Sequence, residues 1–169
     1  MKRILLVLAA LAALVSCKNA GKDADSEYAV DMFKQGDVLP AFSLPDRTGA
    51  IRTPADFAGK YVVYDFWATW CPDCREDVPA MKELYAEYGD KVAFVGISFD
   101  TDPEKLDAFV EENGIGWVQL SDFVTKKESK VAEQFRVKWI PSMYLVAPDG
   151  TVRLGTVMVG KLALALEAL

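Results

Sequence analysis

The alternation of apolar and polar positions predicts strands and helices in turn from about residue 38 onward. Tyr61–Phe66 is a run of β-branched and aromatic residues with the length of a buried strand. Apolar positions between Val78 and Tyr88 then recur at helical spacing, and Gly89 ends that helix. The other expected elements are hairpins over 40–53 and 143–159, strands over 92–98 and 117–120, and helices over 102–113, 130–135 and 162–169.

This order of elements predicts one α/β domain. Strands alternate with helices and then close with a hairpin and a helix, which implies a mixed central sheet with helices on both faces. The segment 17–37 is polar and mostly acidic, and it has too few apolar residues to offset the entropy of ordering. We therefore expect a flexible tether over 17–37 and a folded domain over 38–169.

The N-terminus has the pattern of an export signal. Met1–Arg3 is cationic, and Ile4–Val15 is an unbroken apolar run. A helix of that length is about 18 Å long, too short for the ~30 Å core of a bilayer. The run ends at Leu14–Cys17, which resembles the bacterial lipobox, and this implies cleavage after residue 16 and lipidation of Cys17. The protein is then expected in the cell envelope as a membrane-anchored lipoprotein; the alternative is an ordinary secretory signal with an incidental cysteine.

Charge and cysteine content narrow the partners. Cleavage would remove Lys2 and Arg3 and no acid, which leaves 17 basic against 25 acidic residues and a formal charge of about −8. Such a chain is repelled by phosphate, so nucleic acid is not an expected partner. The chain has three cysteines and no histidine. With Cys17 as the lipid anchor, Cys71 and Cys74 form one CxxC pair and none remains for a structural disulfide.

The CxxC pair lies where a buried strand passes into a helix. At that place the free N–H groups and the positive end of the helix dipole favour a thiolate on Cys71, which is the attacking species. Cys74 lies one turn further in and is shielded by the helix, so it can resolve a mixed disulfide. Pro72 has no N–H and sets a helical φ in the first turn. The pattern predicts a redox-active dithiol.

Two other interpretations of the pair are weaker. A zinc site needs about four ligands, and the chain offers two cysteines and no histidine, so we expect no metal. A structural disulfide within four residues would close very little chain and would add little stability. It would also need neither Trp70 nor a proline between the cysteines.

The motifs together resemble the thioredoxin superfamily. The run Asp65–Cys74 is followed by Pro79 and, far downstream, by Ile140-Pro141, and the resemblance covers about 39–169. Within the superfamily the chain is similar to the TlpA/ResA branch of membrane-tethered disulfide reductases. Three features favour that branch: the N-terminal β-hairpin, an extra helix and strand at 101–122, and export. The resemblance implies a thioredoxin fold and a thiol:disulfide oxidoreductase without a cofactor.

The resemblance also assigns residue roles. Asp65 matches the buried acid that exchanges a proton with the resolving sulfur, although an acid satisfied by backbone groups is the alternative. Pro141 matches the cis-proline that faces the CxxC pair, with an ordinary trans loop proline as the alternative. Ile140 would offer backbone groups to a substrate strand. Gly160 matches a glycine that lines the same groove, or it is a simple turn glycine. The expected substrate-contacting residues are Trp70, Pro72, Ile140, Pro141 and Gly160, and Trp67 belongs either to the site or to the core.

The chain departs from the pattern of the families that it resembles at three places. Asp77 stands where the branch usually has Glu, so its role as a second acid is in doubt because its reach is shorter. Gly96 stands where thioredoxin has a lysine beside the buried acid, and burial without that cation raises the pKa of a carboxyl group such as Asp65. Trp139 replaces a glycine before Ile140, where its ring either narrows the substrate range or covers the core.

A thiol peroxidase of the peroxiredoxin family is the main alternative from another class. Its signature needs a proline and a hydroxyl residue before the reactive cysteine. The corresponding places hold Tyr64 and Ala68 before Cys71, and Trp67 and Cys71 before Cys74, so the signature is absent. A copper chaperone would need a histidine ligand, and a redox-inactive binding module would not need both cysteines.

The direction of electron flow is suggested by Asp73, which lies between the cysteines. An anion about 7 Å from a thiolate, at an effective dielectric of about 40, disfavours that thiolate by roughly 1 kcal/mol. This favours a reductase over an oxidase or isomerase of the same fold. The expected partners are disulfide-bearing exported proteins as substrates, a membrane thiol relay as electron donor, and the membrane itself through the lipid anchor.

Overall fold

The computed structural model describes residues 23–169, which form a mixed α/β fold. Its central sheet has the strand order β5-β4-β3-β6-β7. β3, β4 and β5 are parallel, whereas β6 is antiparallel to β3 and β7 is antiparallel to β6. These strands span Tyr61–Trp67 (β3), Val92–Ser98 (β4), Val118–Leu120 (β5), Ser142–Val146 (β6) and Val152–Thr156 (β7). The mixed sheet expected from the sequence is therefore confirmed.

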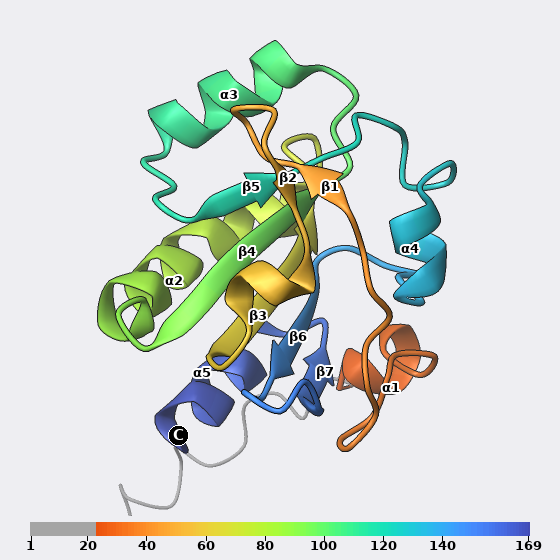
Figure 1. The fold of residues 1–169 in the computed structure, drawn as a ribbon, viewed down its shortest axis with the longest axis vertical. Coiled ribbons are helices and arrows are strands. Elements are labelled where there is room, and N and C mark those ends of the chain that lie inside the picture. The colour runs from red at the N-terminus through yellow and green to blue at the C-terminus, as the bar shows by residue number, and fades with distance from the viewer. Residues whose placement is uncertain (1–22) are drawn as a thin grey trace, which may run out of the picture.

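Helices and a hairpin cover the two faces of the sheet. In Figure 1, α2 lies behind β4 and α5 lies next to it, while the short hairpin β1–β2 and the 3-10 helix η1 cross in front. α3 follows β4 and leads to the edge strand β5. The helices span Asp25–Tyr28 (α1), Pro72–Tyr88 (α2), Pro103–Glu112 (α3), Lys130–Gln134 (α4) and Val159–Glu167 (α5), with η1 at Pro54–Phe57 and the hairpin strands at Leu44–Pro45 (β1) and Ile51–Arg52 (β2).

The core lies between the sheet and these layers. β3 is buried at every position after Tyr61, as its unbroken apolar and aromatic sequence predicts for a central strand. Aromatic rings from distant segments meet on the hairpin side, where Phe66, Phe135 and Tyr144 pack with ring centroids 5.2–6.4 Å apart. This packing holds the carboxyl end of β3 in place, where the cysteines follow.

The segment before the domain differs from the expected tether. Residues 23–37 fold against β7 rather than extending freely, and Ala29 and Met32 are buried in the core. The backbone of Gly36 and Asp37 exchanges hydrogen bonds with Val152, so the segment covers the edge of the sheet. The prediction of a tether is wrong for this part, because its few apolar residues find a partner surface on a distant strand.

Gly155 allows this close approach. A Cβ atom at this position would lie 2.8 Å from the carbonyl oxygen of Phe33 and 3.0 Å from the ring of Tyr144. Any side chain would therefore push the N-terminal segment off β7. The final helix also begins earlier than expected, at Val159 rather than 162.

Candidate active site

The two cysteines lie at the start of α2, directly after the carboxyl end of β3. Cys71 is the N-cap residue of α2, and its Sγ accepts a hydrogen bond from the backbone N–H of Cys74 at 3.3 Å. Both cysteines are free thiols and both are buried. A sulfur in the N-cap position meets the free N–H groups of the first turn, which is the placement that the sequence predicts.

The loop before β6 faces Cys71. The Ile140–Pro141 peptide bond is cis, as the resemblance implies. The thiol of Cys71 donates to the carbonyl oxygen of Ile140 at 3.6 Å, so this loop and the CxxC turn are in direct contact. Trp70 is 58% exposed and Trp139 is 41% exposed at this rim. Pro72 is also exposed, so four of the five residues expected to contact substrate lie at one place.

Gly160, the fifth expected substrate-contacting residue, is at the start of α5, and its role in the groove stays a prediction. It is exposed in the first turn of α5, with open space where a Cβ atom would be. Trp67 is buried in the core, where its indole N–H donates to Gln119 Oε1 at 2.9 Å, and it also lines a small cavity behind Cys74. Cys17 and the expected signal peptide lie outside the described residues.

A small cavity of about 10 Å³ lies behind Cys74. Asp65, Asp77 and Trp117 line it together with the Cys74 side chain and Pro141. The buried Nε1 of Trp117 has no hydrogen-bond partner within residues 23–169. The two acids proposed from the sequence therefore share one enclosed space with the resolving sulfur, despite the shorter side chain at position 77.

Burial dominates the electrostatics of this cavity. It raises the pKa of Asp65 to about 7, with a further contribution from the charge of Asp77. Gly96 is the cross-strand neighbour of Asp65, so no side chain at that position supplies a cation. Burial, together with the charges of Asp73 and Glu76, raises the pKa of Asp77 to about 6.

Burial also raises the pKa of the Cys74 thiol, and the hydrogen bond with Cys71 and the charge of Asp65 act in the same direction. Cys74 therefore remains protonated in the reduced protein and needs a base before it can attack. Asp65 titrates near neutral pH in the same cavity, which suits it to accept that proton.

Asp100 is a residue of the site that the sequence analysis missed. It is buried where β4 ends, beside the loop that carries the cysteines. Its carboxyl oxygens accept from the backbone N–H of Thr69 at 3.0 Å, from the Thr69 hydroxyl at 2.5 Å and from the Ser98 hydroxyl at 2.6 Å. The carboxyl ends of adjacent parallel strands meet at one edge of a sheet, and this rule could have drawn attention to Asp100.

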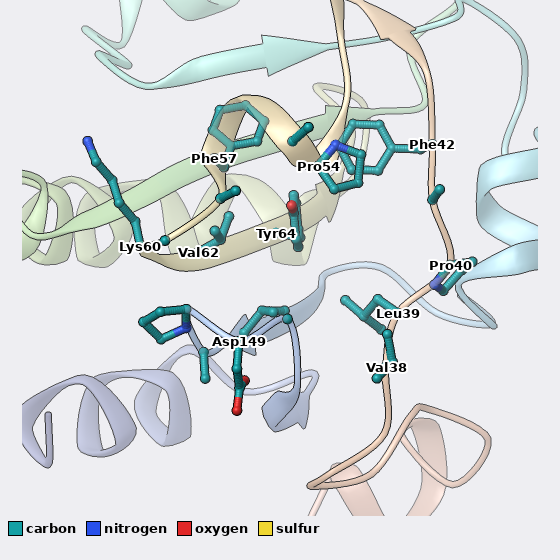
Figure 2. Close-up of a pocket in the computed structure, with 18 of the residues that line it drawn as sticks. Val38, Leu39, Pro40, Phe42, Pro54, Phe57, Lys60, Val62, Tyr64 and Asp149 are labelled. Carbon is teal, nitrogen blue, oxygen red and sulfur yellow. The ribbon is translucent and has the colours of Figure 1, made fainter.

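A second, larger cavity lies away from the cysteines. It has a volume of about 360 Å³ and is mostly apolar. Its lining includes Val62, near the start of β3, and Val146, at the end of β6, which are paired across the two strands. Figure 2 shows Phe42, Phe57 and Tyr64 on one side of it and Val38 and Leu39 on another. It shares no lining residue with the cavity behind Cys74.

Residues 23–169 contain neither a membrane-spanning helix nor a cluster of metal-ligating side chains. None of the helices in this part of the chain is both long enough and apolar enough to span a bilayer. The same residues contain no group of three or more His, Cys, Asp or Glu side chains placed to hold a metal ion.

The chain is similar in sequence to a known family and to thiol-disulfide oxidoreductases. Residues 35–154 match the model of the AhpC/TSA family. The chain is 31% identical over 154 residues to the thiol-disulfide oxidoreductase ResA of Oceanobacillus iheyensis, an alignment that covers 88% of this chain and 75% of that protein.

Solved structures agree with the sequence comparison. A thiol-disulfide oxidoreductase from Bacteroides fragilis is 29% identical with a TM-score of 0.70, over 79% of this chain and 100% of that one. The thioredoxin domain of a thiol-disulfide oxidoreductase from Bacteroides vulgatus is also 29% identical, with a TM-score of 0.72 over 80% of this chain and 97% of that one. The region that matches the family model, residues 35–154, includes both cysteines and the cis-proline loop.

Proposed function

Because the chain belongs to the AhpC/TSA family and is a thiol:disulfide oxidoreductase of thioredoxin fold, we propose that it acts as a disulfide reductase on exported proteins. The observation that carries this direction is the charge around the sulfurs. The charge of Asp77 raises the pKa of Asp65, and the charge of Asp73 raises the pKa of Asp77. The charge of Asp65 in turn raises the pKa of Cys74. The Arg75 guanidinium lies over the ring of Phe109, 5.9 Å from its centroid. Strong oxidants of this chemistry stabilise their reduced form, and an acidic site does the opposite.

The reaction follows from the positions of the two sulfurs. The thiolate of Cys71 attacks one sulfur of the substrate disulfide, forms a mixed disulfide and releases the other substrate sulfur as a thiol. Asp65 takes the proton of Cys74, whose sulfur then attacks Cys71. The second substrate thiol leaves, and Cys71 and Cys74 remain as a disulfide. The substrate has gained two electrons and two protons, and a dithiol donor must then reduce the protein again.

The standard reduction potential tests this direction. We expect a value more negative than about −220 mV after equilibration with dithiothreitol or glutathione buffers, in the range of reducing members of the fold. Asp73→Asn should shift the potential upward because it removes an anion beside the sulfurs. A wild-type potential near about −120 mV would show instead that the protein is an oxidase or isomerase.

We also place the reaction at the membrane surface of the cell envelope. The lipobox-like Leu14–Cys17 supports this proposal, with a lipid anchor on Cys17 and a membrane thiol relay as electron donor.

A further inference from the structure

Tyr28 is part of the rim of the active site, although it lies in a segment that the sequence analysis treats as a tether. Its ring stacks on the ring of Trp139, with centroids 4.4 Å apart and an interplanar angle of 28°. Trp139 directly precedes Ile140, whose carbonyl oxygen is 3.6 Å from the Cys71 sulfur. The stack is therefore attached to the loop that faces the reactive thiol.

Helix α1 holds Tyr28 in this position from both sides. Asp25 accepts hydrogen bonds from the Thr156 hydroxyl and from the Val157 N–H, both at 2.8 Å, and pairs with Lys161 at 2.7 Å. Ala29 follows Tyr28 and is buried in the core. The ring thus belongs to a docked element and keeps its place when no substrate is bound.

The hydroxyl end of Tyr28 is directed toward acidic groups. A hydrogen bond with Glu27 is the largest cause that raises the pKa of Tyr28, and the charge of Asp73 acts in the same direction. Asp73 lies between the two cysteines, so Tyr28, stacked on Trp139 beside the cis-proline loop, is within electrostatic range of the CxxC turn. Partly exposed aromatic faces next to carboxylates form an environment that attracts cationic side chains.

We propose that Tyr28 and Trp139 form a specificity-determining wall of the substrate groove, which favours disulfides in polypeptides that carry a basic residue beside the cysteine. The proposal rests on the proposed function, since it concerns the substrates of the same cysteine pair. An extended substrate segment that reaches Cys71 along the cis-proline loop passes this wall. A lysine or arginine next to its cysteine can then lie on the aromatic faces, near Glu27 and Asp73.

Two peptides and one small disulfide test the proposal. Each peptide contains one disulfide, and the two differ only in having arginine or glutamate beside the cysteine; the small substrate is the neutral bis(2-hydroxyethyl) disulfide. For the wild type we expect kcat/KM to be about tenfold higher for the arginine peptide, mainly through KM, which corresponds to a cation–aromatic contact of ordinary strength. Tyr28→Ala should reduce that preference to about twofold, whereas Tyr28→Phe keeps the ring and should retain it.

Val30→Ala is the matched control, because Val30 is 60% exposed in the same segment and its loss should leave the preference unchanged. Limited proteolysis of Tyr28→Ala shows whether α1 stays docked, and Tyr28→Leu, which retains apolar packing without an aromatic face, separates docking from recognition. An equal loss for both peptides and for the small disulfide would overturn the proposal and show that the stack is structural. Equal rates of the wild type on the two peptides would overturn it as well. Failure of the wild type to reduce any of the three substrates would instead contradict the proposed function.

Discussion

At the scale of single residues, Cys71 and Cys74 differ in their surroundings although both are buried. The Cys71 sulfur accepts the N–H of Cys74 at the helix start and faces the cis-proline loop. Burial raises the pKa of the Cys74 thiol, so this sulfur remains protonated. Chemical reactivity should therefore separate the two cysteines clearly.

We expect limiting iodoacetamide to alkylate Cys71 before Cys74 in the reduced, folded protein. The thiolate is the reactive form, and the N-cap position of Cys71 favours it. Peptide mapping by mass spectrometry gives the order of labelling. In urea the two cysteines should label at similar rates, and preferential labelling of Cys74 in the folded protein would reverse the roles assigned here.

Asp65→Asn should stabilise the protein increasingly as the pH rises from about 4 to about 7. Burial raises the folded-state pKa of Asp65 from 3.8 to about 7, so the folded protein binds a proton that the unfolded chain releases within this range. The wild type therefore loses stability as the pH rises, and the variant does not. Between pH 4 and a pH above 7 we expect the stability of the variant relative to the wild type to increase by about 4 kcal/mol, measured by urea unfolding.

Asp90→Asn is the control for this titration, because Asp90 is exposed and its replacement should change the stability little across the same pH range.

Stopped-flow kinetics of Asp65→Asn should show normal attack by Cys71 and resolution by Cys74 slowed about tenfold, or about 1.4 kcal/mol in the barrier. Slowed attack with normal resolution would mean that Asp65 is a structural acid and that the base is Asp77.

At the scale of secondary-structure elements, the site depends on how strand ends and short segments are joined. The end of β4 is linked to the loop before α2 through Asp100, and α1 is linked to the end of β7 through Asp25. Both links are carboxyl groups that accept several hydrogen bonds from a distant element. Loss of either acceptor leaves donors unpaired in partly or fully buried surroundings.

Asp100→Ala should destabilise the fold by about 2–4 kcal/mol, because it leaves the hydroxyls of Ser98 and Thr69 and the Thr69 N–H without their acceptor. It should also slow attack by Cys71, since Thr69 and Cys71 are in the same loop. Urea unfolding and stopped-flow measurements test the two effects. Asp122→Ala, an exposed acid on a neighbouring loop, should change neither; an unaltered stability of Asp100→Ala would show that the network does not hold the loop.

Asp25→Ala should release residues 23–37 from the domain without unfolding the sheet. The change leaves the Val157 N–H and the buried Thr156 hydroxyl unpaired, which costs about 1–3 kcal/mol locally. Limited proteolysis should cleave the variant within this segment at least tenfold faster than the wild type. Asp23→Ala removes an exposed partner of the same lysine and should have little effect; equal protection of Asp25→Ala would show that α1 is held by other contacts.

At the scale of the whole molecule, the proposed lipid anchor decides where the protein works. The lipoprotein modification would supply more than one acyl chain, and stable membrane binding needs more than one. We expect the full-length wild type to sediment with membranes and Cys17→Ala to be released into the soluble fraction. Cys74→Ala, expressed in parallel, should stay with the membrane, whereas a soluble wild type with a different mature N-terminus would contradict the lipid anchor.

Much of the fold could be predicted from local sequence because it depends on short-range patterns. The apolar run of β3, the helical spacing in α2 and the Asp102-Pro103 start of α3 each specify an element through nearby residues. The CxxC pair at a helix start specifies its chemistry in the same way, since the helix terminus lies within a few residues of Cys71.

The remaining features depend on contacts between segments that are far apart in the chain. Residues 23–37 look too polar to fold, and they become ordered only because β7 offers an edge and Gly155 leaves room for them. Asp100 joins the site at the edge of the sheet, through its hydrogen bond with Thr69, and Tyr28 joins it through its stack on Trp139. Neither contact is encoded in a local sequence pattern. The start of α5 at Val159 rather than 162 is a further feature that the local pattern does not specify.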